Sequence, residues 1–200
     1  MLREIVGRKL GLRFHTPNGL HAKMLDEELA TLAKRSGFKT IRLSLETIEP
    51  GRQGDWDDKV SYDDFLAAAG LLKAAGFAAD EIGAYVMTGL PGETLEEAAR
   101  SIAAAHAAGV EVRLAQYSPI PGTAYFERAR REARADISEP LLQNNTAVSA
   151  GGIGGYEDYA RLKSFARVLN DALAAGRLLL TVGEVRNGFA AAMAGAGFEL

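Results

Sequence analysis

The sequence predicts an α/β fold, specifically a partial (β/α) TIM-like barrel with about four parallel strands and extra C-terminal helices. Apolar strand-like segments alternate with helix-like segments over the first two thirds of the chain. Three helical patterns end in a similar way, at Gly37, Gly76 and Gly109, which indicates a strand–helix unit repeating at roughly 35 residues. Strands joined through helices usually lie parallel, with right-handed crossovers.

Four strands are predicted, at residues 9–15, 39–47, 82–88 and 110–117. Three of them alternate apolar and charged or polar residues, as in LGLRFH, IRLSLET and VEVRLAQY. Strands buried on both faces would be nearly continuous apolar runs, and a packed barrel core would not tolerate so many charges. We therefore expect one apolar face under the helices and a polar inner face, in a wide or open barrel whose interior holds ligand and water.

The helices are predicted from apolar spacing and capping residues, at residues 20–36, 61–75, 94–108, 123–135 and 156–175. Thr94 and Glu97 form a capping-box pattern, and Ser61 with Asp64 comes close to one. His106, late in an alanine-rich helix, is expected at the surface or near the helix dipole. AGGIGG at 150–155 is expected to be flexible, and the small-residue-rich C-terminus at 190–200 receives no assignment.

The predicted organisation is a half-barrel over residues 1–135, followed by a helical extension over residues 136–200. The first strand is expected to begin almost at Met1, with nothing preceding it. Four strands cannot close a barrel, and an uncovered edge strand is an aggregation liability. We therefore expect a truncated or split protein, a degenerate protein or an intertwined oligomer, in which another half-barrel or a dimer partner covers the first strand.

Composition excludes several classes of function. The net charge of −3 suggests neither nucleic acid nor an anionic membrane as a partner. No segment approaches the roughly 18 apolar residues of a membrane span, and the N-terminus lacks the apolar core of a signal peptide, so a cytoplasmic location is expected. Without cysteine the chain has no disulfide, thiolate nucleophile or cysteine-bound metal site. A GK[ST] phosphate loop, a GxGxxG motif and a Ser-His-Asp order are also missing.

Several short segments together carry a resemblance to a known family: TPNGLH, SLET, GLPGET and YSPIPGT, followed by LLQNN. Over roughly residues 8–175 the chain resembles the second half of a radical S-adenosylmethionine (SAM) barrel. The resemblance is closest to bacterial members with an N-terminal cobalamin-binding domain. It implies an open, six-stranded partial barrel, of which strands three to six are present here.

The family resemblance also implies cofactors. In such enzymes a [4Fe–4S] cluster, held by a CxxxCxxC loop, binds SAM and generates a 5′-deoxyadenosyl radical. That loop and the glycine-rich SAM-amine motif are absent from this sequence. The chain is therefore expected neither to bind the cluster nor to cleave SAM by itself. Cobalamin would require a domain that is also absent, no residue is assigned as catalytic, and the substrate and reaction type cannot be read.

Site residues follow from the same resemblance. Ser44 and Glu46 would contact the ribose and amino-acid part of SAM, or else form a structural polar network with Arg42. Tyr117 and Ser118 would lie around the adenine, or else begin a proline-shaped turn.

Residues after the first strand form a second group. His15 and Asn18 would lie on the substrate side, although Asn18-Gly19 is also a turn dipeptide. His15 and His21 are a weak metal signal. Glu93 is either a general base or, by preference, an acidic residue of the first turn of its helix.

Three functions remain open. The first is a portion of a radical SAM enzyme, with cobalamin dependence as the closest family resemblance suggests. The second is a non-catalytic barrel remnant that serves as a binding or assembly module, which the lack of cysteine and the exposed edge favour. The third is an unrelated (β/α) enzyme that uses Glu46 and His15 as an acid–base pair.

Overall fold

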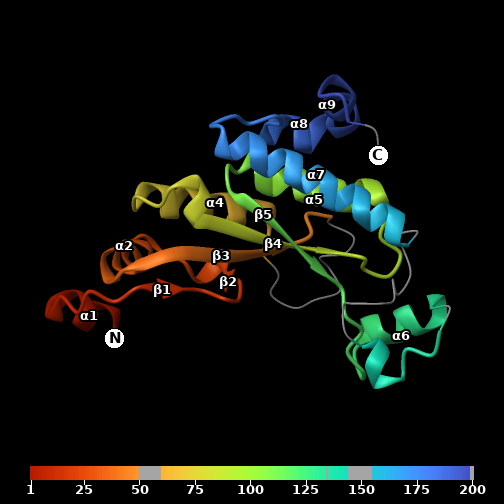
Figure 1. Ribbon diagram of the computed structural model, residues 1–200, viewed down its shortest axis with the longest axis horizontal. Coiled ribbons are helices and arrows are strands. Elements are labelled where there is room, and N and C mark those ends of the chain that lie inside the picture. Colours follow the sequence, from red (N-terminus) through yellow and green to blue (C-terminus); the bar gives the residue numbers. More distant parts are fainter. Residues whose placement is uncertain (50–59, 134, 144–154, 199–200) are drawn as a thin grey trace.

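A parallel sheet forms the centre of the molecule in the computed structural model, which describes residues 1–49, 60–133, 135–143 and 155–198 (Figure 1). Its strand order is β1-β3-β4-β5, and a short strand, β2, pairs with β3 beyond β1. The strands are β1 (Phe14–His15), β2 (Leu20–His21), β3 (Phe38–Glu46), β4 (Ile82–Thr88) and β5 (Glu111–Gln116). All pairings are parallel, which confirms the predicted α/β half-barrel.

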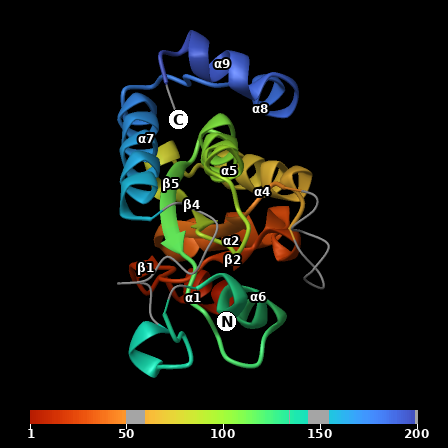
Figure 2. The ribbon, with the colours of Figure 1, turned by 90° about the vertical axis from the view of Figure 1, so that its right-hand side faces the viewer.

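Helices cover one face of the sheet, as Figures 1 and 2 show for α4, α5 and α7. The main helices are α2 (Glu27–Ser36), α4 (Tyr62–Ala74), α5 (Leu95–Ala107) and α7 (Tyr156–Ala174). Ile41, Leu43 and Leu45 of β3 belong to the same buried cluster as Phe65 of α4 and Ile102 of α5. Burying each such side chain contributes about 1.5–3 kcal/mol, so the alternation in IRLSLET determines which face the helices cover. The opposite face, which we call the inner face, keeps the polar residues.

The predicted capping signals of two helices are confirmed, while a third helix begins later than expected. Ser61–Asp64 and Thr94–Glu97 both form reciprocal capping boxes. The predicted helix at residues 20–36 starts only at Glu27, because the Asp26 carboxylate accepts a hydrogen bond from Leu29 N at 2.7 Å. The residues before it form β2 and a 3₁₀ turn, η1 (Ala22–Met24).

The N-terminus differs from the prediction. A helix, α1 (Leu2–Arg8), precedes the sheet and packs against α2, and the strand predicted at residues 9–15 is reduced to Phe14–His15. Lys9 ends α1 with φ 51° and Gly11 has φ 62°, so extended backbone cannot begin before them. The expectation that nothing precedes the first strand was therefore wrong.

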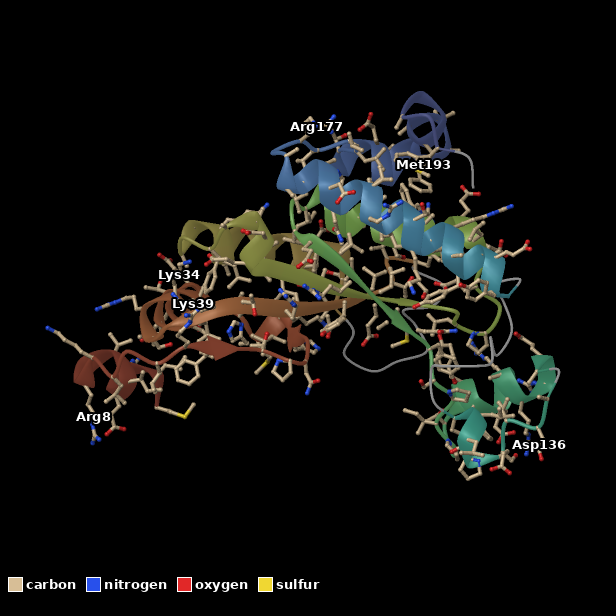
Figure 3. All side chains as sticks on the ribbon, viewed as in Figure 1. Arg8, Lys34, Lys39, Asp136, Arg177 and Met193 are labelled. Atoms are coloured by element: carbon tan, nitrogen blue, oxygen red, sulfur yellow. The ribbon has the colours of Figure 1, made fainter. Side chains whose placement is uncertain are left out.

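A small lobe follows β5. It contains α6 (Ala124–Glu132) and a 3₁₀ turn, η3 (Pro140–Leu142), and lies apart from the helical layer (Figure 2). Asp136 lies in this lobe, away from the sheet (Figure 3). A second hydrophobic cluster holds the lobe to the ends of β4 and β5; its buried members are Leu90, Tyr117, Tyr125, Phe126, Ala129 and Ile137. The AGGIGG segment predicted to be flexible lies, except for Gly155, outside the described residues.

The C-terminal residues form two helices that were not assigned from sequence, α8 (Val182–Asn187) and α9 (Phe189–Gly195). Thr181 and Glu184 form a capping box at α8, a signal that was present in the sequence. Met193, on α9 in Figure 3, is buried in the main core together with Leu169 of α7. The helices after the lobe therefore share one core with the strands. Among the described helices, none combines the length and hydrophobicity needed to cross a membrane.

His106 is fully buried, so its predicted surface position was wrong. Helix α5 lies between the sheet and the layer of α7 and α8, which leaves it little free surface. The ring Nε2 accepts a hydrogen bond from Leu179 N at 2.8 Å. Burial lowers the pKa of His106, which outweighs the opposite effect of the Leu169 backbone. This ring therefore acts as a neutral acceptor that fixes the segment before α8.

Candidate functional site

The carboxyl ends of β3, β4 and β5 lie together at one end of the parallel sheet, where barrel proteins place their sites. Ser44 and Glu46 end β3, and Tyr117 and Ser118 follow β5. Between them lies the turn Gly89–Thr94 that joins β4 to α5. Tyr117 N donates to Thr88 O at 2.8 Å, which extends the pairing of β4 and β5 by one step. The fold thus brings all four predicted cofactor contacts to the carboxyl-terminal end of the sheet, on either side of this turn.

Glu46 has a left-handed backbone, with φ 60°. The register of β3 against β4 shifts at this point: Ser44 pairs with Tyr85 and Glu46 with Val86, so Leu45 is unpaired. A bulge of this kind re-aims the next side chain. A non-glycine residue in this region costs about 1–2 kcal/mol, and such strain tends to gather at functional sites. This local conformation distinguishes Glu46 from an ordinary strand residue.

Ser44 lies beneath the loop between β1 and β2. A Cβ atom added to Gly19 would lie 2.1 Å from Ser44 Oγ, so only glycine allows this approach. The Tyr85 hydroxyl donates to Pro17 O at 3.0 Å and holds the same loop on the inner face. Asn18, predicted on the substrate side, is an exposed residue of this loop. The structure therefore brings Asn18 and Ser44 into one region.

His15 lies farther down the sheet. It is exposed, and its Nδ1 is 2.8 Å from Thr40 Oγ1. From Thr40 to Glu46 the strand advances about 20 Å, which is too far for an acid–base pair. The proposed pairing of Glu46 with His15 was therefore wrong.

His15 and His21 also lie at different levels of the sheet. His21 pairs with Ser44 in the sheet, about 13 Å from the level of Thr40. In the part of the chain that the structure describes, no group of three His, Cys, Asp or Glu side chains could hold a metal ion.

Tyr117 is enclosed by the second hydrophobic cluster, with its ring centroid 6.2 Å from that of Tyr125. Its hydroxyl is fully buried and makes no hydrogen bond to any described residue, and the same is true of the Thr88 hydroxyl. Burial raises the pKa of Tyr117, so the phenol is neutral. Buried hydroxyls without partners are costly. These two hydroxyls lie at the carboxyl ends of the adjacent strands β4 and β5. Ser118, which directly follows Tyr117, is half-buried.

Glu93 holds the GLPGET turn closed. Its buried carboxylate accepts hydrogen bonds from Gly89 N at 2.7 Å and Leu90 N at 3.2 Å. Neither predicted role applies: Glu93 precedes the N-cap residue Thr94 rather than lying in the first turn, and it does not face solvent as a base. Sequence spacing carries no signal for this role, because it depends on the turn folding back on itself.

These residues fit SAM but do not fit an iron–sulfur cluster. Glu46 supplies a carboxylate that can accept from ribose hydroxyls or an ammonium, and Ser44 and Tyr117 supply hydroxyls. The uncommitted Tyr117 hydroxyl is the structural observation that fits a polar ligand at this end of the sheet. A cluster needs thiolate ligands, and the sequence contains no cysteine. Any cluster ligand must therefore come from outside this chain.

The chain matches one curated enzyme in sequence. No protein-family model matches the chain. In sequence it is 30% identical over 138 residues to the GTP 3′,8-cyclase 1 of Mycobacterium tuberculosis, in two strains. The match covers 68% of this chain and 36% of the relative, so the chain spans about a third of the length of the curated relatives it matches.

Solved structures share the fold. The radical SAM methyltransferase TsrM from Kitasatospora setae, with tryptophan and a SAM analogue bound, superposes with a TM-score of 0.60 at 18% identity. The match covers 98% of this chain and 46% of that one. The methylornithine synthase PylB has a TM-score of 0.52 at 17% identity, covering 90% of this chain and 50% of its own. At these identities the likeness shows the fold.

Proposed function

This chain is a half-barrel of the radical SAM type, and we propose that it supplies the part of such an enzyme that contacts the nucleoside and amino-acid portions of SAM. The observation that carries the proposal is Glu46, held in a left-handed conformation by a bulge at the carboxyl end of β3. Strain at this position is retained where a side chain must point at a ligand. The resemblance to radical SAM enzymes also predicts a contact between this residue and the ribose of SAM.

The proposed roles divide the site by strand. Glu46 and Ser44 bind the ribose hydroxyls and the amino-acid group of SAM. Tyr117 and Ser118 lie by the adenine, with the buried Tyr117 hydroxyl as a hydrogen-bond donor or acceptor. His15 and Asn18 lie on the substrate side. SAM, when bound, supplies the adenosyl group of the reaction, while this chain orients it and excludes water from it.

The first strand edge is the proposed attachment point for the rest of the barrel. At the other edge, Asn170 of α7 occupies the backbone groups of Val112 on β5. New pairing is therefore favoured along β1 and β2, where another half-barrel or a second copy would dock. The cluster cysteines are proposed to lie in the portion that docks there, which makes this chain inactive alone. A cobalamin domain is a further proposal, supported by the TsrM structure that contains cobalamin.

A non-catalytic binding module is the second candidate, favoured by the absence of cysteine from the sequence. The two candidates differ in what they require of SAM chemistry. If the chain is combined with a complementary half-barrel that carries the cluster cysteines, an enzyme portion gains SAM cleavage under reducing conditions. A binding module gains none.

The direct test is binding of S-adenosylhomocysteine to the purified chain, followed by amide chemical shifts. Shifts are expected at Glu46 and Ser118, and Glu46→Gln is expected to weaken binding about tenfold, because a charge-assisted hydrogen bond becomes neutral. Glu139→Gln, at an exposed position in the lobe, serves as the matched control. Equal affinity of the two variants, or the absence of shifts at the strand ends, would contradict the proposal.

A further inference from the structure

Two rows of residues cross the inner face from the middle of β3 to the amino-terminal halves of β4 and β5. Arg42 of β3, Gly83 of β4 and Glu111 of β5 are paired in register, and the next row contains Ser44, Tyr85 and Arg113. Successive side chains on a strand alternate between its faces, so both rows point away from the helices. This face therefore carries two arginines and one carboxylate side by side.

Arg113 already occupies the carboxylate of Glu111. Its Nη2 is 3.0 Å from both carboxylate oxygens, and its Nε is 3.3 Å from Oε2. Arg42 reaches the same carboxylate only at 3.8 Å, beyond hydrogen-bond distance. The single hydrogen bond that its guanidinium makes to a described residue runs from Nη1 to Ile41 O, at a long 3.5 Å. One carboxylate thus faces two guanidinium groups, which leaves one positive charge unbalanced.

An unbalanced positive charge at Arg42 is unusual, because this residue is only 9% exposed. Burial, followed by repulsion from Arg113, lowers the pKa of Arg42, and the attraction of Glu111 does not compensate. An arginine nevertheless stays protonated in proteins. A buried charge with few hydrogen bonds is costly, so the arrangement calls for an anionic partner.

The guanidinium is also accessible from the inner face. Its Nε and Nη2 atoms make no hydrogen bond to a described residue, yet neither belongs to the fully enclosed atoms without partners. They are therefore open to the interior of the half-barrel. Gly83 makes this position available: a Cβ atom there would lie 2.8 Å from Arg42 Cδ and 2.9 Å from Nη1. The guanidinium lies across β4 where a side chain would otherwise stand.

Among the residues proposed to contact SAM, Ser44 lies in the same row as Arg113, whereas Glu46 and Tyr117 lie farther along the strands. From Arg42 to Glu46, and from Arg113 to Tyr117, the strands advance about 13 Å. The arginine pair therefore lies deeper in the half-barrel than the strand ends. A ligand would reach the guanidinium groups by entering the half-barrel past the strand ends where SAM is proposed to bind.

We propose that Arg42 and Arg113 bind a carboxylate or phosphate group of a small molecule other than SAM, on the inner face of the half-barrel. Guanidinium groups present paired donors that match the geometry of both anions. Glu111 positions the two arginines and competes with the ligand for them. That the small molecule is the substrate of the enzyme rests on the proposed function; anion binding itself does not.

Titration of the purified full chain with pyrophosphate and, separately, citrate tests this site, with amide shifts of Gly83 and Arg113 as the readout. Arg113→Gln is expected to weaken binding about tenfold, because it removes charge-assisted hydrogen bonds. Glu111→Gln is expected to tighten binding several-fold, because the competing carboxylate is gone. Arg161→Gln, at an exposed arginine of α7, is the matched control and is expected to have no effect.

Opposite effects of two neighbouring substitutions separate this proposal from a structural ion network and from general unfolding. If Glu111→Gln fails to tighten binding while circular dichroism shows it folded, the proposal is overturned. Equal losses in Arg113→Gln and Arg161→Gln would overturn it too. A second arm adds saturating S-adenosylhomocysteine: unchanged anion affinity is expected, whereas displacement would show that these arginines serve SAM itself.

The two proposals fail separately. Loss of S-adenosylhomocysteine binding with intact anion binding would remove the proposed function and leave the anion site. The reverse result would remove only the anion site.

Discussion

Asn170 of α7 pairs with Val112 of β5 as a neighbouring strand would. Its Oδ1 accepts from Val112 N at 2.8 Å, and its Nδ2 donates to Val112 O at 2.9 Å. One side chain therefore satisfies both backbone groups of a residue on the free edge of β5. Open sheet edges invite pairing with other chains, and a helix that covers the edge prevents it. Helix α7 thus closes the edge of β5 at Val112.

Replacing Asn170 by Leu is expected to destabilise the protein by about 1–3 kcal/mol, because both backbone groups of Val112 lose their partners in a half-buried site. Urea unfolding measures the change. Asn187→Leu, at the exposed end of α8, is the control and is expected to shift stability by less than about 0.5 kcal/mol. Similar losses in both variants would show that Asn170 does not protect the edge.

Stability is expected to depend on His106 below neutral pH. Burial lowers the pKa of His106 from its usual 6.5 in the folded protein only. The unfolded chain therefore binds a proton first, so this contribution is complete above about pH 6.5 and is lost as the pH falls toward the lowered folded value. His106→Gln keeps an acceptor for Leu179 N but cannot titrate there.

The measurement compares urea unfolding at pH 7.5 and 5.5 for the wild type and His106→Gln. The wild type is expected to lose more stability than the variant over this interval. An equal loss in both would mean that carboxylates, rather than this histidine, govern the pH response.

Two substitutions at Glu46 separate its backbone strain from its carboxylate. Glu46→Ala and Glu46→Gly both remove the carboxylate, but only glycine tolerates φ 60° without cost. The glycine variant is expected to be more stable than the alanine variant by about 1 kcal/mol, while both bind S-adenosylhomocysteine equally weakly. Thermal unfolding and calorimetric titration provide the two readouts. Alanine as stable as glycine would rule out the strain.

Gly19 is expected to tolerate no side chain. Gly19→Ala would place its Cβ 2.1 Å from Ser44 Oγ and 2.9 Å from Ser44 N, so the loop must lift and the hydrogen bond of Tyr85 to Pro17 must break. A loss of about 1–3 kcal/mol is expected. Gly70→Ala is the opposite case: nothing lies within 4 Å, and the helix α4 is expected to gain about 0.5–1 kcal/mol.

Chemical denaturation of both glycine variants checks this pair. The prediction requires changes of opposite sign. A neutral Gly19→Ala would show that the loop does not lie on Ser44 in solution.

Local patterns were sufficient for much of the fold. The alternation in IRLSLET assigned Ile41, Leu43 and Leu45 to the helix-covered face, and the capping residues marked where α4 and α5 begin. These signals depend on residues close together in sequence, so they survive without knowledge of the rest of the chain. Where a local signal was overlooked, as with Thr181 and Glu184 at α8, the helix was missed.

One predicted position failed because distant segments pack over it, and another because a short turn folds back on itself. His106 has the surroundings of a surface residue in its own helix, and only the packing of α7 and α8 over α5 buries it. Glu93 reads as part of a helix start, but its carboxylate turns back to Gly89 and Leu90. In each case the deciding contact is a hydrogen bond or a packing layer that sequence spacing does not encode.

Periodicity and short motifs are local properties, and they were enough to predict the class of the fold, the polar inner face and the resemblance to radical SAM enzymes. Tertiary structure alone decided the left-handed bulge at Glu46, the closed edge at Val112 and the excess of guanidinium over carboxylate around Gly83. These features arise when strands far apart in sequence meet in register, and desolvation and hydrogen bonding then act between residues that were never neighbours along the chain.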